Sequence, residues 1–383
     1  MQDVIVIGGG IVGAGVARDA ALRGLSVTLL EKRTVGWGTS SRSSRLIHGG
    51  IRYLELGDLH LVREALAERA ILLHIAPHLV RPLPFLFVAD AGEYWQWFRL
   101  SVGVLLYRLL AAGHAMGSHR PLSRRQLRRH EPLLGGAPLL GGALYQDAHG
   151  DDIGLVHSNI RSAREASARI LEGTHATIRV GQDEVTATLP SGELVSARAV
   201  VLAAGPWTDA VRAEIGLPPR ALVGGTKGVH ITFAIDRFPL RHAVALRHPD
   251  DHRVMFCIPE PESRRVLVGT TDTETSESPD ALTVSNLDVT YLLRAVQRLF
   301  PALALTEADI RDRWAGVRPL LRQQGAESGR TREHLLVREG RVLTIAGGKL
   351  TTYRKMAEEV VDALGVLFGV ELPPCVTAER QLP

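Results

Sequence analysis

Apolar and small residues alternate along the first thirty positions in a pattern that predicts two parallel strands joined by a helix. Val4–Ile7 is an apolar, β-type run that breaks into a glycine-rich turn, and a second apolar run, Val27–Leu30, ends at Glu31. The stretch between the runs is rich in Ala and Gly and has the pattern of a helix that packs closely on a strand. The sequence therefore predicts a βαβ unit, the element from which doubly wound sheets are built.

The hydrophobic pattern of the remaining chain predicts an alternation of helices and strands. Helices are expected over 59–75, 122–130, 156–171, 287–300 and from the glycines at 347–348 to about Phe368. Strands are expected over 83–88, 142–146, 177–180, 185–189, 199–203, 254–259, 265–269, 335–337 and 342–345. We predict an α/β fold in which a Rossmann-like dinucleotide-binding domain (1–80, 147–218 and 334–383) is interleaved with a substrate domain built on a mixed or antiparallel β-sheet (81–146 and 219–333).

The first strand-to-helix turn carries the spacing G-x-G-x-x-G. Gly8 permits the tight turn, Gly10 lets backbone N–H groups approach a pyrophosphate, and Gly13 lets the helix pack close to the strand. The N-terminus of the helix adds unpaired N–H groups and a partial positive charge. Glu31 can accept hydrogen bonds from the adenosine ribose hydroxyls, which argues against a 2′-phosphate. The expected ligand is NAD or FAD.

Two polar segments predict further contacts with this ligand. The stretch 34–57 has neither helical nor strand periodicity, and its hydroxyl groups suit phosphate, ribityl and ring contacts, although Ser43 and Ser44 also fit a helix cap. The segment 347–352 repeats the first turn, with two glycines and then threonines that could cap a helix. Asp147, Asp151 and Asp152 are interpreted as a turn and a helix cap, and no metal site is expected.

The segment Tyr94–Gly113 contains five aromatic side chains and few charges. It is interpreted either as a core helix or as an interfacial helix whose aromatic face lies among lipid headgroups. Arg99 and Arg108 within it suit anionic lipid.

Composition sets broad limits on the class of protein. The chain has 383 residues, 45% of them hydrophobic and 22% charged, as in a soluble globular protein. Its two cysteines, Cys257 and Cys375, favour a reducing compartment. We expect a cytoplasmic protein, because no leader precedes the first strand and no apolar run reaches the roughly 18 residues of a membrane span.

The net charge of +4 suits an anionic substrate or a membrane surface, and no nucleic-acid partner is expected. Most of the basic residues are Arg; the lysines are Lys32, Lys227, Lys349 and Lys355. An ammonium group can shift its pKa and is not interchangeable with guanidinium. Lys227 and Lys349 fall in glycine-flanked turns and are candidates for function. The segment 226–232 also places Lys227, together with the candidate His230, at the start of a strand. Arg318 lies in a loop-like context.

Seven segments together resemble a known family: GGGIVGAG, TSSRSSRLIHGGIRYLE, AAGPWTD, KGVH, GTTD, GVRP and GGKLTTYRK. They resemble FAD-dependent glycerol-3-phosphate dehydrogenase, of the D-amino-acid-oxidase-like flavoproteins. The resemblance runs in order from Asp3 to about Leu382 and does not include the helical C-terminal domain usual in that family. It implies FAD as cofactor and oxidation of sn-glycerol 3-phosphate to dihydroxyacetone phosphate by hydride transfer to the flavin, an oxidoreductase reaction on CH–OH. The electrons would pass to quinone or another acceptor.

The resemblance also implies roles for individual residues. His230, Arg318 and Lys349 would surround the reacting hydroxyl, with His230 the first choice of base. The implied substrate-binding residues are Arg52, Tyr53, Thr270 and Arg332, of which the arginines suit a phosphate dianion. The implied cofactor-binding residues are Gly8, Gly10, Ile11, Val12, Gly13, Glu31, Lys32, Thr39, Ser40, Ser41, Ser44, Leu46, His48, Gly49, Gly50, Ala204, Gly205, Trp207, Gly348, Lys349, Leu350 and Thr351.

Three other functions stay open at this point. The chain could be a related flavin oxidase of amino acids or small hydroxy acids, a catalytically silent flavin-binding protein, or an NAD-binding subunit. Peripheral binding to the inner face of the cell membrane and a homodimer are further expectations.

Overall fold

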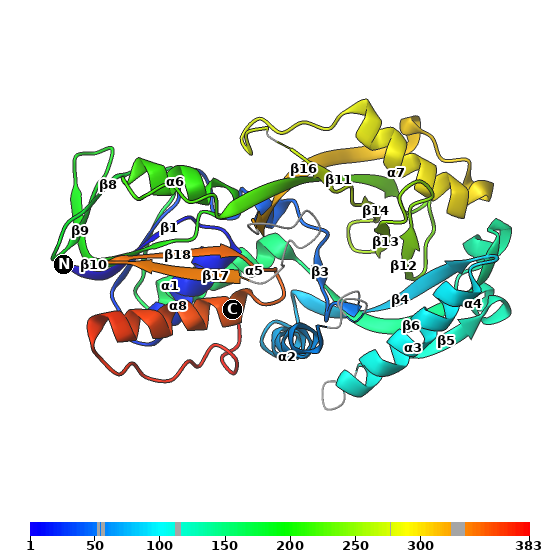
Figure 1. The fold of residues 1–383 in the computed structure, drawn as a ribbon, viewed down its shortest axis with the longest axis horizontal. Helices are drawn as coiled ribbons and strands as arrows, with labels where there is room; N and C mark the ends of the chain where they lie inside the picture. The colour runs from blue at the N-terminus through cyan, green and yellow to red at the C-terminus, as the bar shows by residue number, and fades with distance from the viewer. Residues whose placement is uncertain (52–53, 55–57, 112–115, 276, 323–333) are drawn as a thin grey trace.

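The computed structural model describes the chain except residues 52–53, 55–57, 112–115, 276 and 323–333. Two β-sheets follow one another along the long axis of the molecule, and helices cover their outer faces (Figure 1). The mixed α/β architecture predicted from the sequence is confirmed.

The first sheet has a parallel centre in the order β18–β10–β1–β2–β7, with β17 antiparallel to β18 and the β8–β9 hairpin antiparallel to β10. Its strands are β1 (Gln2–Ile7), β2 (Val27–Leu30), β7 (Arg169–Leu171), β8 (Thr177–Val180), β9 (Val185–Thr188), β10 (Leu194–Leu202), β17 (His334–Glu339) and β18 (Val342–Gly347). Helices α1 (Ile11–Leu22), α5 (Asp152–Glu165) and α8 (Tyr353–Phe368) share one hydrophobic core with it, and α6 (Thr208–Glu214) follows β10. The central strands are continuous apolar runs because both of their faces are buried.

The second sheet runs β15–β11–β14–β13–β12–β4–β6–β3, with β16 on β11 and β5 on β6; among these pairs only β12–β4 is parallel. Its strands are β3 (Leu46–Ile47), β4 (Val80–Asp90), β5 (Arg120–Ser123), β6 (Leu139–Gly150), β11 (Val223–Ala234), β12 (Ala243–Arg247), β13 (Val254–Glu260), β14 (Arg265–Gly269), β15 (Thr273–Glu274) and β16 (Ile310–Leu321). Helices α4 (Arg124–His130) and α7 (Asn286–Leu299) pack on one face, and α2 (Leu59–Ile75) and α3 (Tyr94–Leu110) on the other.

Several predicted elements are confirmed. The helix over 59–75 is α2, and the predicted pairs 177–180 with 185–189, 254–259 with 265–269 and 335–337 with 342–345 are antiparallel neighbours. The proposed domain ranges stay a proposal; β3 in the first range pairs with β6 of the second sheet.

The helix predicted over 156–171 is wrong at both ends. Asp151 caps the helix at its N-terminus, where its carboxylate accepts from the Gly154 N–H, and Glu165 ends it. Ser167 then adopts a left-handed conformation with φ 71°, which turns the chain into strand β7. The short segment 168–171 fits either a helix or a strand, and its pairing with β2 makes it a strand.

Three residues assigned to turns or loops lie in long strands. Lys227 is in β11, Arg318 is in β16 and Asp147 is in β6, so the turn and loop interpretations are wrong, whereas the strand expected over 226–232 is confirmed. Asp151 and Asp152, by contrast, form the cap and first turn of α5. Glycines near these positions suggested turns, but pairing with neighbouring strands extends the strands through them.

Helix α3 is not a core helix. Among its residues only Val104 and Tyr107 are buried, and six large apolar or aromatic side chains are exposed. The exposed side chains are Tyr94, Trp95, Phe98, Val102, Leu105 and Leu109.

Candidate active site

The glycine turn after β1 is tightly enclosed. Gly8 has a φ of 105°, and a Cβ there would lie 2.6 Å from the Ala203 carbonyl oxygen. A Cβ on Gly13 would lie 1.9 Å from the Gly8 carbonyl oxygen. Only glycine fits at either position, and α1 is thereby brought against β1 with its N-terminus at the end of the strand.

A cavity of about 530 Å³ adjoins this turn. Its wall is formed by the carboxyl ends of β10, β1 and β2, the loop after β2 and the turn after β18, as represented by Trp207, Gly10, Glu31, Ser40 and Gly348. A ligand site at the carboxyl ends of adjacent parallel strands is the arrangement that the doubly wound topology favours.

Polar groups are already oriented around the glycine turn. One carboxylate oxygen of Glu31 accepts from the Gly9 N–H at 2.7 Å, and the other accepts from the Arg33 N–H at 2.8 Å. Ser40 Oγ accepts from the Ile11 N–H at 3.0 Å, at the first turn of α1. The acidic side chain and the helix N-terminus therefore face the same cavity, as the sequence predicts.

The second glycine turn approaches the cavity from β18. Gly347 and Gly348 have φ values of 76° and 83°, and a Cβ on Gly348 would lie 2.3 Å from Met356 Sδ. Helix α8 begins only at Tyr353, and the side chain of its cap residue Thr352 makes no capping hydrogen bond. The predicted threonine cap is thus wrong. Thr351 instead accepts from the His48 N–H at 3.1 Å and ties this turn to the loop after β3.

His230 is buried in β11 beside the loop 39–44. Its Nε2 lies 2.9 Å from Ser44 Oγ, and its ring stacks on Trp314 with centroids 5.5 Å apart. Burial, followed by the charges of Arg318 and Arg45, lowers the pKa of His230 to about 3, so the imidazole is neutral at physiological pH. A neutral imidazole can accept a proton from an alcohol, and a pKa of about 3 makes it a weaker base than a histidine of ordinary pKa.

Ser43 and Ser44 do not cap a helix. Ser43 Oγ donates to Asp152 at 2.8 Å, and Ser44 pairs with His230. Both hydroxyls therefore connect the loop to other elements.

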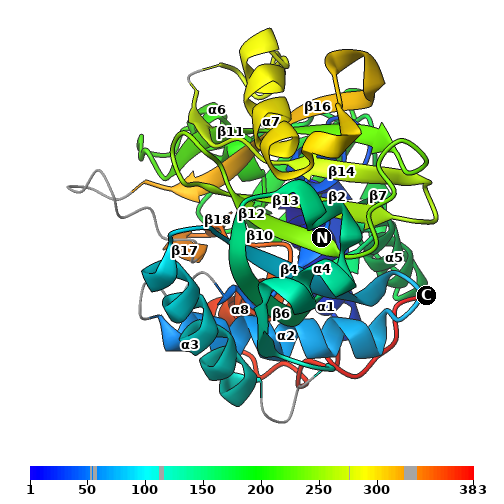
Figure 2. The same ribbon diagram turned by 90° about the vertical axis from the view of Figure 1, so that its right-hand side faces the viewer.

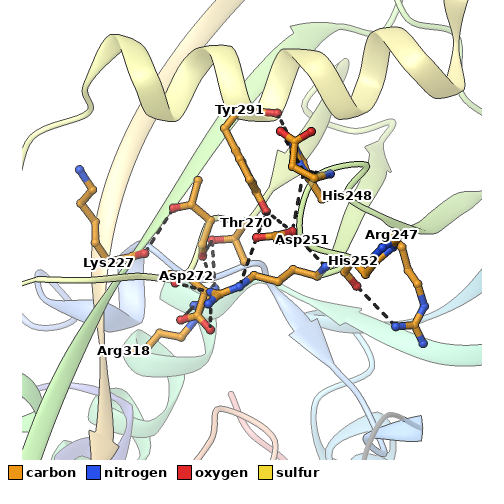
Figure 3. Close-up of polar contacts among 12 residues, drawn as sticks. Lys227, Arg247, His248, Asp251, His252, Thr270, Asp272, Tyr291 and Arg318 are labelled. Carbon is orange, nitrogen blue, oxygen red and sulfur yellow. Dashed lines mark hydrogen bonds and ion pairs between the residues drawn. The ribbon is translucent and has the colours of Figure 1, made fainter. Parts of the chain in front are cut away.

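Arg318 lies on β16, beside β11, and is held by the segment that follows β14. Its guanidinium donates to Asp272 Oδ1 at 2.7 Å, to Thr270 Oγ1 at 3.0 Å and to the Thr271 carbonyl oxygen at 3.1 Å (Figure 3). A Cβ on Gly228 would lie 2.8 Å from Thr270 Oγ1, so the glycine makes room for this contact. The sequence predicted Arg318 and Thr270 but not Asp272, although the GTTD segment contains it.

The contacts of Arg318 continue to the surface of α7. Asp272 also pairs with Arg253 at 3.2 Å, and Arg253 pairs with Asp251 at 3.3 Å. Tyr291 on α7 donates to Asp251 at 2.9 Å, as Figure 3 shows. A chain of alternating charges thus fixes the orientation of Arg318.

Strand β16 links this cluster to the cavity. Thr39, which lines the cavity, donates through Oγ1 to the Val317 carbonyl oxygen at 2.7 Å. Pro319 lines the same cavity on the other side of Arg318 in the sequence, and Lys349 lines it from the second glycine turn.

Lys227 has a structural contact set. Its Nζ lies 2.8 Å from Asp288 Oδ2 and donates to the Thr283 carbonyl oxygen at 3.3 Å, and the residue is 7% exposed. Its side chain therefore joins β11 to the beginning of α7 and does not line the cavity.

The residues predicted to bind the cofactor divide into two groups. Those that line the cavity are Gly8, Gly10, Ile11, Val12, Glu31, Lys32, Thr39, Ser40, Ala204, Gly205, Trp207, Gly348, Lys349 and Leu350. Those that do not line it are Gly13, Ser41, Ser44, Leu46, His48, Gly49, Gly50 and Thr351. Arg52, Tyr53 and Arg332 lie outside the described residues. Trp37 and Gly38 also line the cavity and were not predicted, although they lie in the polar segment 34–57.

A buried polar group supports the loop after β3. One oxygen of Asp147 accepts from the Gly49 N–H at 3.0 Å, from Tyr107 Oη at 2.7 Å and from Arg69 at 2.5 Å. Burial raises the pKa of Asp147, although the charge of Arg69 opposes the shift. No local sequence pattern indicates this group, because its members come from α2, α3 and β6.

Comparison with known proteins identifies the family of this chain. The family model described as FAD dependent oxidoreductase matches residues 3–354. The chain belongs to this family. The residues around the cavity fit FAD: Gly8 and Gly10 line it at the N-terminus of α1, and Glu31 lines it at the end of β2, where a ribose would be bound.

Curated relatives of this FAD-dependent oxidoreductase are similar over nearly its whole length. It is 38% identical to aerobic glycerol-3-phosphate dehydrogenase of Staphylococcus haemolyticus, with 94% of this chain and 66% of the relative covered. It is also 38% identical to glycerol-3-phosphate dehydrogenase of a Synechocystis species, with 100% of this chain and 73% of the relative covered. The chain thus spans about two thirds to three quarters of the length of these relatives.

Solved structures share the fold. The glycerol-3-phosphate dehydrogenase of Bacillus halodurans, complexed with FAD, has a TM-score of 0.79 and 32% identity, and the match covers 100% of this chain and 68% of that one. The L-α-glycerophosphate oxidase of Mycoplasma pneumoniae, with FAD bound, has a TM-score of 0.77 at 17% identity, with 100% and 99% of the two chains covered.

Proposed function

We propose that this FAD-dependent oxidoreductase oxidises sn-glycerol 3-phosphate to dihydroxyacetone phosphate. One observation carries the proposal. The neutral imidazole of His230 and the guanidinium of Arg318 lie on adjacent strands, β11 and β16, beside the cofactor cavity. The names of the curated relatives and of the Bacillus halodurans structure support the choice of substrate.

The residues of this chain would divide the chemistry among them. FAD, when bound, supplies the acceptor for the hydride that leaves the secondary carbon. His230 takes the hydroxyl proton, since its imidazole is neutral and Ser44 fixes the ring. Arg318 and Lys349 stabilise the negative charge that develops on the oxygen. Arg52, Tyr53, Thr270 and Arg332 complete the proposed substrate site.

An anaerobic titration of the purified yellow protein with sn-glycerol 3-phosphate tests this function. We expect the flavin absorbance near 450 nm to bleach, and dihydroxyacetone phosphate to form in equal amount. Bleaching by amino acids or hydroxy acids, but not by glycerol 3-phosphate, would favour the flavin oxidase instead. A flavin that none of these compounds bleaches would favour a silent flavin-binding protein.

We further propose that the protein binds a membrane surface through helix α3 and passes its electrons to quinone there. Helix α3 lies at the surface of the second sheet (Figure 2), on the face that α2 also covers. Tyr94 and Trp95 are 70% and 68% exposed, and Trp95 stacks on Phe98 with centroids 5.5 Å apart. No acidic residue lies between Tyr94 and Leu110.

Basic side chains flank this apolar face. Helix α3 itself carries Arg99 and Arg108, and both are exposed. An apolar face with basic neighbours suits a helix that lies in the plane of an anionic membrane. None of the helices in the described part of the chain is both long and apolar enough to cross a bilayer.

Sedimentation with lipid vesicles tests the membrane surface. We expect binding to vesicles with anionic phosphatidylglycerol, weaker binding to neutral phosphatidylcholine, and a large loss in the variant Trp95→Ser/Phe98→Ser. The matched control is Leu287→Ser, which removes a side chain that is 82% exposed on α7, on the opposite face of the sheet. Equal binding of both variants and the wild type would contradict a role of α3.

A further inference from the structure

The carboxylate of Asp280 bridges two sides of the cofactor cavity. Asp280, in the segment between β15 and α7, contacts three residues near the first sheet. Its Oδ2 accepts from Trp207 Nε1 at 2.9 Å and lies 3.4 Å from Lys32 Nζ, and its Oδ1 accepts from Arg33 at 3.2 Å. Lys32 and Trp207 both line the cavity.

The order of the strands shows what the bridge spans. Lys32 lies just after β2, and Trp207 lies in the turn after β10. Strand β1 lies between these two strands in the parallel sheet, and its carboxyl end carries the Gly8–Gly10 turn. Asp280 therefore connects the two elements that flank the glycine turn at which a dinucleotide binds.

Aromatic and cationic side chains continue the same wall. Lys32 Nζ lies 5.0 Å from the centre of the Trp207 ring, and the Trp37 and Trp207 ring centroids lie 5.9 Å apart. Arg33 stacks on Trp37 at 3.8 Å, and Arg42 lies 4.5 Å from the centre of the same ring. The wall is thus held by several weak contacts that converge on Asp280.

The segment that carries Asp280 is anchored to the second sheet. Lys227, buried in β11, donates to the Thr283 carbonyl oxygen and pairs with Asp288 in the first turn of α7. Ser285 and Asp288 form a capping box at the same end of the helix. A local turn, in which the Ala281 N–H donates to the Ser278 carbonyl oxygen, orients Asp280. Figure 1 shows the segment before α7 reaching from the second sheet toward α6.

From these contacts we infer that Asp280 is a latch that retains FAD by closing the cavity wall between Lys32 and Trp207. The latch holds the two sides of the wall together over the glycine turn, so loss of the contacts of Asp280 speeds the release of the dinucleotide. Lys227 positions the latch through the anchored segment. The inference depends on FAD as the cofactor and not on the identity of the oxidised alcohol.

Release of FAD from the holoprotein tests the latch. We expect Asp280→Ala to release FAD about 10-fold faster or more than the wild type, because one indole hydrogen bond and two partly exposed ion pairs are lost together. Timed ultrafiltration and the fluorescence of the freed FAD give the rate. Asp236→Ala is the matched control, since Asp236 is also an exposed carboxylate and pairs with Arg264 through both oxygens.

Two further measurements separate the latch from general destabilisation. Asp280→Asn keeps the size of the side chain and an oxygen that can accept from Trp207, so its release rate should lie between those of the wild type and Asp280→Ala. High salt should accelerate release from the wild type more than from Asp280→Ala, because it screens the pairs with Lys32 and Arg33. Release from both Asp280 variants at the wild-type rate, within about twofold, or an equal effect of salt on all proteins, would overturn the inference.

The outcome is distinguishable from a failure of the proposed function. A protein that releases FAD faster in the Asp280 variants but is not bleached by glycerol 3-phosphate would keep the latch and lose the substrate. A wild type that is bleached by glycerol 3-phosphate, with variants that release FAD at its rate, would keep the substrate and lose the latch.

Discussion

Ser44 Oγ and His230 Nε2 lie 2.9 Å apart, and this contact joins the loop at the cofactor cavity to strand β11. Among the described residues, the hydroxyl is the hydrogen-bond partner of the imidazole, whose Nδ1 has none, so it determines how the buried ring is oriented. Together with the stacked Trp314, it holds the proposed base in place.

Substitution Ser44→Ala should therefore slow the reduction of the flavin by glycerol 3-phosphate about 10-fold or more, because the base loses its orienting hydrogen bond. Anaerobic stopped-flow absorbance gives the rate. Ser41→Ala is the control, since Ser41 Oγ donates to backbone carbonyl oxygens of its own loop, at 2.9 Å to that of Trp37. Equal rates in the two variants would contradict the role of Ser44.

Lys349→Ala should retain FAD and lose most of its reduction by substrate, by about 100-fold, because a charge that stabilises the developing alkoxide is removed. The stoichiometry of bound FAD and the stopped-flow rate are measured on the same sample. Lys355→Ala is the matched control: Lys355 pairs with Glu358 on α8 at 3.0 Å and does not line the cavity. An unchanged rate in Lys349→Ala would remove Lys349 from the mechanism.

Gly49→Ala should destabilise the protein by about 1–3 kcal/mol, the usual effect of forcing extra volume into a packed core. The new Cβ would lie 2.3 Å from Tyr107 Oη and 2.4 Å from Leu66 Cδ2. Urea denaturation followed by circular dichroism gives the free energy of unfolding. Gly135→Ala serves as control because a Cβ there meets no atom within 4 Å; equal stability of both variants would refute the packing argument.

Glu260 should stabilise the fold in a pH-dependent way. Burial by itself raises the pKa of Glu260, but hydrogen bonds from His149 and Arg265 and the charge of Arg45 outweigh it and lower the pKa to about 2, against 4.5 for an ordinary Glu. Because the folded-state pKa is the lower one, the stabilisation is fully present above pH 4.5 and is lost as the pH falls toward 2.

The variant Glu260→Gln makes this dependence measurable. At pH 7 we expect it to be less stable than the wild type by roughly 3 kcal/mol, which is the free-energy equivalent of the pKa shift. The difference in unfolding free energy should shrink to less than half of that value by about pH 3. A difference that stays constant from pH 7 to pH 3 would show that the carboxylate charge is not the cause.

The cofactor half of the site was predictable because its signals are local in the sequence. Gly8, Gly13 and Glu31 belong to one βαβ unit, and each answers a steric or hydrogen-bonding need that the sequence spacing expresses directly. Helix α2 and the three antiparallel pairs were likewise fixed by the period of their own apolar residues.

Long-range pairing decided what the sequence could not. Lys227 and Arg318 follow glycines and looked like turn residues, but β11 and β16 pair along nearly their whole lengths and draw both into strands. Lys227 then forms a structural ion pair with Asp288. Arg318 instead donates to Asp272 and Thr270. Residues of the same kind at similar positions thus have different roles.

By itself, the sequence determined the α/β class, the dinucleotide turn and, through the resemblance of its motifs, the family. Only the tertiary structure brought Ser44 to His230, Asp272 to Arg318 and Asp280 to Trp207. The physical reason is that a strand or a glycine turn is specified by neighbouring residues. A hydrogen bond between residues 46 to 186 positions apart depends on how two sheets and their connecting segments pack.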